Sequence, residues 1–416
     1  MFEHPLLARL VLGYSAVIDR QRSVIATRLT LAPASSGPAG DEVAGDELMQ
    51  LLGQSWPEEA GALSLRMRPL EGGGGVKSLA GMALMINAAG EPLLRALLGV
   101  AAVPRFVIEV PAFFAADPAV AAAVRSVSDG GGLLAIKGLG GEPLPAALAG
   151  CFALQVDDGA APEPSAQARS NPVRARLGVR SPAELEAAFA SGCVLAAGWP
   201  FGDPPPASAG KKAIAPELQV ILELINRVDR EEPVDRLEAV LKNDPTLAFR
   251  LIRYINSPGF GLSVEIGSFR HALMILGYQK LKRWLALLLA SASKDANMKP
   301  VMFAAVRRGL IMEELVKSSG DAELRGELFI CGVFSLLDRL LGQPFAELLR
   351  AVPVSERVRQ ALLGEEGPFL PYLELVQAIE QESVIDVREK AERLMLAPAE
   401  VNRALLSALA AAAQLD

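Results

Sequence analysis

The hydrophobic pattern of this 416-residue chain changes once, at Asp203-Pro204-Pro205-Pro206. Before this point, short apolar runs alternate with helix-sized segments, which predicts βα units around a parallel sheet. After it, the periodic segments have helical spacing, which predicts an irregular bundle. We therefore expect a two-domain protein: an α/β barrel at 1–206, a linker at 207–212 and an all-helical domain at 213–416.

Short apolar runs bounded by turn residues mark the expected strands of the first half. They are Leu10–Leu12, Val24–Leu29, Leu63–Met67, Ala83–Ile86, Phe106–Val110, Leu133–Ile136, Phe152–Val156 and Val194–Ala197. The segments Pro92–Gly99, Pro118–Ser126 and Pro182–Ser191 have helical patterns, the last two with proline in the first turn. The stretches at 72–75 and 162–172 are typical of loops, so the walls of the barrel are expected to be thin.

Charge and hydropathy narrow the classes of partner. The net charge is −7 and the sequence pI is about 5.3, which argues against a dedicated nucleic-acid binder. The longest apolar run, Trp284–Ala292, is far shorter than a membrane span, and Met1–Tyr14 is unlike a signal peptide. We expect a cytoplasmic protein without membrane insertion.

Four segments of the second half carry a recognisable order of turns and helices. They are Asn243–Leu247, Asn256–Phe260, Ile266–Leu273 and Leu276–Tyr278. This succession resembles the HDOD module, a helical relative of the HD phosphohydrolases without their metal centre. The chain has only two histidines, and His271 is followed by Ala272 rather than by the aspartate that such a metal centre needs. The resemblance implies signal relay through protein contacts, with no metal and no cofactor.

The first half resembles the EAL domain, the barrel of cyclic-di-GMP phosphodiesterases. The resemblance is carried by Leu84–Asn87, Val107–Val110, Ala135–Gly140, Gln155–Asp157 and Gly198–Pro204. Active members hold two metal ions with carboxylates and an asparagine at the carboxyl ends of the strands. Asn87, Glu109 and Asp157 match this pattern, but the expected acids fall on Arg28, Lys137 and Arg180, and a further one falls on Gly138. The resemblance therefore implies a degenerate EAL-like domain, a β/α barrel of the TIM-like type.

Three cations in place of three acids would repel metal ions, since one like-charge contact near 4 Å costs about 4 kcal/mol at an effective dielectric constant of 20. We therefore expect no hydrolysis and a chain that is not an enzyme. Arg28, Lys137 and Arg180 are candidate contacts for an anion or nucleotide. Alternatively, their side chains are solvated or paired with nearby acids.

Three functions remain open. The first is a non-catalytic scaffold or adaptor that acts through protein partners in bacterial signalling. The second is a metal-independent cyclic-di-GMP receptor, which substitution of Arg28, Lys137 or Arg180 by glutamate would abolish. The third is an active cyclic-di-GMP phosphodiesterase, against which the charge reversals count.

Overall fold

The structure is a computed structural model. It describes residues 4–34, 43–56, 83–103, 105–139, 146–148, 150–158, 173–206, 216–242, 269–290, 293, 295–350 and 352–412. The chain forms two compact units. The first contains Met1–Asp203, Lys299–Val301 and Glu374–Asp416, and the second contains Pro204–Met298 and Met302–Leu373.

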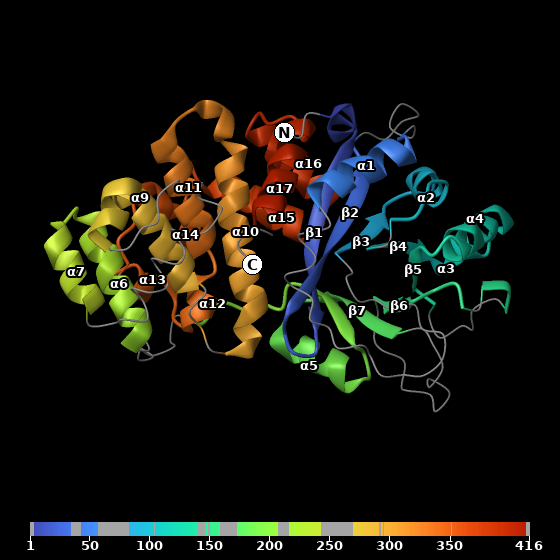
Figure 1. Ribbon diagram of the computed structural model, residues 1–416, viewed down its shortest axis with the longest axis horizontal. Coiled ribbons are helices and arrows are strands. Elements are labelled where there is room, and N and C mark those ends of the chain that lie inside the picture. Colours follow the sequence, from blue (N-terminus) through green and yellow to red (C-terminus); the bar gives the residue numbers. More distant parts are fainter. Residues whose placement is uncertain are drawn as a thin grey trace. The chain divides into compact units, whose positions relative to one another are not determined.

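The first unit is built on a closed barrel whose strands follow the order of the chain (Figure 1). The strands are β1 (Leu10–Asp19), β2 (Val24–Pro33), β3 (Leu84–Ala88), β4 (Phe106–Pro111), β5 (Leu133–Lys137), β6 (Leu154–Asp157), β7 (Val173–Val179) and β8 (Leu195–Gly198). Strand β1 is antiparallel to both β2 and β8, and the remaining neighbours are parallel. The predicted fold class, a β/α barrel followed by a helical region, is confirmed.

Apolar side chains from all around the barrel fill its centre, among them Val17, Ala26, Met85, Val107 and Ala135. The helices that connect the strands of the barrel unit are α1 (Gly45–Ser55), α2 (Glu91–Leu98), α3 (Ala112–Ala115), α4 (Pro118–Asp129) and α5 (Pro182–Ala190). Short 3-10 turns lie at Pro5–Ala8 and Ala146–Leu148. The prolines expected in the first turns of α4 and α5 lie there, each next to a side chain that caps the helix, Asp117 and Ser181.

The end of the chain completes the first unit. Helices α16 (Val384–Arg393) and α17 (Pro398–Ala412) pack against β1 (Figure 1). On α17, the buried Asn402 accepts a hydrogen bond from the backbone amide of Leu12 at 3.2 Å. Its amide group donates to the carbonyls of Leu7 and Leu10 at 2.8 and 2.7 Å. One side chain therefore satisfies three backbone groups of the first strand and the turn before it.

The second unit is helical. Its helices are α6 (Pro216–Asp229), α7 (Val234–Lys242), α9 (Phe269–Ala290), most of α10 (Lys299–Leu315), α11 (Ala322–Phe334), α12 (Leu337–Leu341), α13 (Phe345–Leu348), α14 (Glu356–Leu363) and the start of α15 (Leu370–Glu380), with 3-10 turns at Ala296–Met298 and Lys317–Ser319. Gly277 breaks α9 with a φ of 72°, a backbone conformation that glycine adopts without strain.

Two features differ from the sequence-based expectations, and other predicted segments lie outside the described residues. Strand β7 was not predicted, and the last 43 residues, Glu374–Asp416, belong to the barrel unit rather than to the helical one. The expected strand at 63–67, the linker at 207–212 and most of the HDOD-like turn segments between 243 and 268 lie outside the described residues. Among the described residues, no single helix has the length and apolar character of a membrane span. Helices α16 and α17, which meet at a bend of 108°, have the length and composition of a span only when they are taken together.

Candidate functional site

A buried ion pair lies inside the barrel, between β2 and β4. The Arg28 guanidinium donates from Nε to Glu109 Oε1 at 2.5 Å and from Nη2 to Oε2 at 2.9 Å. Arg28 is 5% exposed and Glu109 is 1% exposed. This two-point geometry is the strongest that arginine and a carboxylate adopt, and it uses both oxygens of Glu109.

Two further polar side chains join this pair at the carboxyl ends of the strands. Lys137, the last residue of β5, places its Nζ 4.0 Å from Glu109 Oε2. Asn87, near the end of β3, donates from Nδ2 to Thr30 Oγ1 at 3.1 Å. The side chain of Lys137 is 24% exposed, so this cation reaches both the buried carboxylate and the solvent.

A fourth charge comes from the far end of the chain. Glu382, which follows α15, accepts hydrogen bonds from Ser15 Oγ at 2.7 Å and from Thr30 Oγ1 at 2.6 Å. It also forms an ion pair with Arg28 Nη1. Glu382, Ser15 and Thr30 were not predicted from the sequence, because no spacing signal connects residues that lie more than 350 positions apart. We call Arg28, Glu109, Lys137 and Glu382 the mouth cluster.

Burial and pairing act in opposite directions on these groups. Burial alone lowers the pKa of Arg28, but Glu109 and Glu382 outweigh it, so the pKa is raised and the side chain stays charged. Burial alone raises the pKa of Glu382, but Arg28 and the hydroxyls of Thr30 and Ser15 outweigh it, so this pKa is lowered. The Arg28–Glu382 pair is therefore fully ionised at neutral pH.

The remaining predicted site residues make other contacts. Asp157 accepts a hydrogen bond from Arg174 Nη2 at 2.9 Å and has no contact with the mouth cluster among the described interactions. Arg180 is exposed, and its backbone amide donates to Glu184 at the start of α5. Of the three candidate cations, the structure brings together Arg28 and Lys137, which share Glu109, whereas Arg180 lies outside the cluster.

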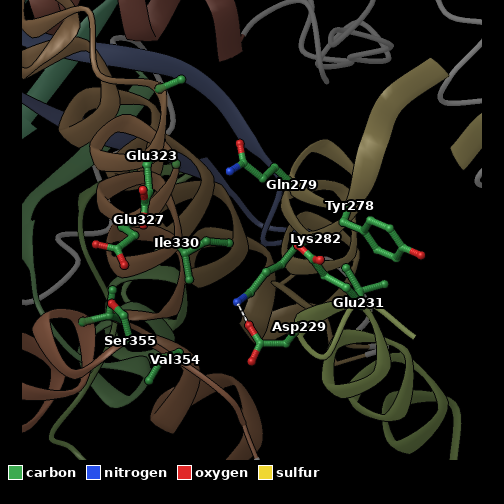
Figure 2. Close-up of a pocket in the computed structure, with 14 residues that line it drawn as sticks. Asp229, Glu231, Tyr278, Gln279, Lys282, Glu323, Glu327, Ile330, Val354 and Ser355 are labelled. Carbon is green, nitrogen blue, oxygen red and sulfur yellow. Dashed lines mark hydrogen bonds and ion pairs between the residues drawn. The ribbon is translucent and has the colours of Figure 1, made fainter. Parts of the chain in front are cut away.

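The second unit has a cavity of its own, of about 360 Å³, between α6, α9, α11 and α14 (Figure 2). Asp229 and Lys282 form an ion pair at its wall. The acids Glu231, Glu323 and Glu327 also line it. With four carboxylates and one lysine, the lining carries an excess of negative charge.

Within the residues that the structure describes, no group of three or more His, Cys, Asp or Glu side chains is placed to hold a metal ion. In the mouth cluster, Glu109 directs both of its oxygens to Arg28. This arrangement does not fit a metal pair, and no chemical step is assigned to one.

Comparison with known proteins decides the family of the second half. The model of the HDOD domain matches residues 215–346. The chain contains an HDOD domain. Two curated relatives are each 30% identical: the uncharacterized protein YuxH of Bacillus subtilis over 165 residues, and the cyclic di-GMP phosphodiesterase CdgJ of Vibrio cholerae over 173 residues. These matches cover 38% and 41% of this chain, and the chain spans only 39% and 40% of the length of the two relatives.

A solved structure, the PaMucR phosphodiesterase in complex with c-di-GMP, aligns with 48% of this chain and 98% of its own, at 20% identity and a TM-score of 0.29. Three findings confirm the predicted organisation, an EAL-like barrel combined with an HDOD domain. They are the closed barrel, the HDOD domain and the similarity to CdgJ.

The expectation that the chain is not an enzyme is contradicted by the similarity to CdgJ, which is named a cyclic di-GMP phosphodiesterase. That expectation assumed three uncompensated cations at the mouth of the barrel. In the structure Arg28 is neutralised by Glu109 and Glu382, and the exposed Arg180 has no contact with the mouth cluster among the described interactions, so the repulsion argument loses its basis.

Proposed function

We propose that this chain is a cyclic-di-GMP signalling protein that recognises the nucleotide at the mouth of its barrel. The observation that carries the proposal is the pair of cations, Arg28 and Lys137, that share Glu109 at the carboxyl ends of the parallel strands. Ligands of β/α barrels bind at this end, where side chains from different strands converge. The similarity to CdgJ supports cyclic-di-GMP as the ligand.

Lys137 is the cation best placed for the first contact with a phosphodiester. Its side chain is partly exposed, and its distance of 4.0 Å from Glu109 leaves its three N–H groups free to turn toward a ligand. An ammonium group binds phosphate oxygens as a point charge and needs no fixed orientation. Replacement of Lys137 by glutamate should therefore weaken nucleotide binding strongly.

The test is a calorimetric titration of the full chain with cyclic-di-GMP, in Mg²⁺ or Mn²⁺ and again in chelator, followed by an assay for the linear product. Binding that Lys137→Glu weakens by about tenfold or more would support the proposal. Product formed in Mg²⁺ or Mn²⁺ would assign hydrolysis to the barrel, as the name of CdgJ suggests. No binding in either buffer would contradict nucleotide recognition.

A second candidate role is signal relay through protein contacts of the HDOD-containing unit. The acidic cavity between α6, α9, α11 and α14 favours a basic segment of a partner protein. Glu323 is exposed at this cavity, so Glu323→Lys should weaken the binding of a short arginine-rich peptide to the full chain. Equal binding by the variant and the original chain would count against this surface.

A further inference from the structure

Glu382 holds a backbone conformation that normally belongs to glycine. Its φ is 57°, and its amide donates to Ile379 O at 3.2 Å while the amide of Ser383 donates to Ala378 O at 3.2 Å. These two bonds form the turn that ends many helices, with the left-handed residue usually a glycine. A side chain there costs about 1 kcal/mol, which points to a use for this carboxylate.

Gly13 of β1 faces Glu382, and because it has no side chain it leaves room for Glu382. A Cβ atom added to Gly13 of β1 would lie 2.7 Å from Glu382 Cα and 3.1 Å from Glu382 Cβ. Only glycine allows β1 and the turn after α15 to approach this closely. The close approach brings the carboxylate within hydrogen-bond distance of Ser15 and Thr30.

The groups around the carboxylate form a donor set for an anion. Two hydroxyls, from Ser15 and Thr30, and one guanidinium, from Arg28, converge on its two oxygens. Arginine with hydroxyl donors binds carboxylate and phosphate groups by the same geometry. Arg28 is fixed in this orientation by its two bonds to Glu109, so the donor set is pre-organised.

The charges of the mouth cluster balance only while Glu382 is present. Arg28 and Lys137 contribute two positive charges, and Glu109 and Glu382 contribute two negative charges. If Glu382 withdraws, one positive charge is left over at a site where Arg28 is almost completely buried. An uncompensated buried charge is unfavourable, so an external anion would be drawn to the vacated donors.

We propose that Ser15, Arg28 and Thr30 form a binding site for one phosphate-class anion, and that Glu382 is its internal competitor. This inference rests on the proposed function, in which the anion is a phosphodiester group of cyclic-di-GMP. The ligand must displace Glu382, so its apparent affinity for the intact chain is its intrinsic affinity multiplied by the fraction of molecules in which the carboxylate has withdrawn.

The test compares the full-length chain with Glu382→Gly, a substitution that removes the carboxylate and suits the left-handed backbone. Glu389→Gln, at an exposed position of α16, is the matched control. Each protein is titrated with inorganic phosphate and with cyclic-di-GMP in chelating buffer, after its cooperative thermal unfolding has been verified. We expect Glu382→Gly to bind both ligands about tenfold or more tightly than the original chain, and the control to bind as the original does.

The outcomes separate this inference from the proposed function. Tighter phosphate binding without any cyclic-di-GMP binding would keep the anion site and contradict nucleotide recognition. Equal phosphate affinity in Glu382→Gly and the original chain would overturn the anion site, whether or not the nucleotide binds. If the glycine variant does not fold, Glu382→Gln replaces it and should show a smaller gain in the same direction. Adding Thr30→Val to either variant should abolish most of the gain, and a gain that persists would place the anion elsewhere and overturn the proposal.

Discussion

Arg28 and Glu109 are joined by two nearly parallel hydrogen bonds across the inside of the barrel, 2.5 Å from Nε to Oε1 and 2.9 Å from Nη2 to Oε2. Removing Glu109 leaves Arg28 and Lys137 with Glu382 as the one remaining acid of the mouth cluster, and breaking a buried ion pair costs about 3–5 kcal/mol. We therefore expect Glu109→Gln to lower the free energy of unfolding of the barrel unit by about this amount. Denaturation in urea, followed by tryptophan fluorescence, measures the change.

Replacing all three buried charges has a different consequence. Arg28→Met combined with Glu109→Leu and Glu382→Gln removes them together, and buried ion pairs replaced in this way commonly lose little stability. The triple variant should therefore be more stable than Glu109→Gln. A triple variant that is less stable than the single one would show that the ion pairs contribute more than their charges cost to bury.

Glu382 should make the stability of the barrel unit depend on pH. Its pKa is lowered from the ordinary value of 4.5, with burial opposing the shift and Arg28 and the hydroxyls of Thr30 and Ser15 outweighing it. Because the folded pKa lies below the unfolded one, the carboxylate stabilises the fold fully above the unfolded pKa, and this contribution is lost as the pH falls through the folded pKa. Glu382→Gln should flatten the fall of the unfolding free energy below about pH 4.5. Identical pH profiles for the two proteins would contradict the ionised state of Glu382.

Gly13 and Gly53 offer a matched pair of substitutions in the first unit. A Cβ atom at Gly13 would meet Glu382 Cα at 2.7 Å, so Gly13→Ala should push the turn after α15 away from β1 and cost about 1–3 kcal/mol. At Gly53, within α1, a Cβ atom meets nothing within 4 Å, and Gly53→Ala should stabilise the helix by about 0.5–1 kcal/mol. Limited proteolysis should cut the last 43 residues faster only in Gly13→Ala.

Helix α11 of the HDOD domain provides a second matched pair. A Cβ atom at Gly332 would lie 2.6 Å from the backbone of Arg308 and Gly309 on α10, whereas at Gly326 it meets nothing within 4 Å. Gly332→Ala should separate the two helices and destabilise the second unit by about 1–3 kcal/mol. Gly326→Ala should leave it unchanged or slightly more stable. Equal thermal unfolding temperatures of the two variants would contradict the close crossing of α10 and α11.

The barrel was predictable where its strands are nearly continuous apolar runs. Strands β3, β4 and β5 are buried on both faces and rich in Leu, Ile and Val, which sets them apart from their surroundings. Strand β7 was missed although it alternates Arg174 and Arg176 with Ala175 and Leu177, because its charged residues obscured a pattern of period two. Arg174 of β7 forms an ion pair with Asp157 of β6.

The site was predictable only in part. Parallel strands align their carboxyl ends, so Asn87, Glu109 and Lys137 were expected near one another. The alternative in which the cations pair with nearby acids describes Arg28, which binds Glu109 and Glu382. The role of Glu382 could not be predicted from the sequence. Its contacts depend on how α15 and α16 return to β1 and not on any local pattern.

Asn402 and Glu382 also bear on how the protein is made. Synthesis proceeds from the amino terminus, so β1 and Arg28 leave the ribosome well before the groups on α17 and after α15 that satisfy them. Most of the helical unit is made in the interval. Until Glu382 and Asn402 emerge, a nascent barrel exposes one side of its first strand and a buried-type charge that lacks its second partner.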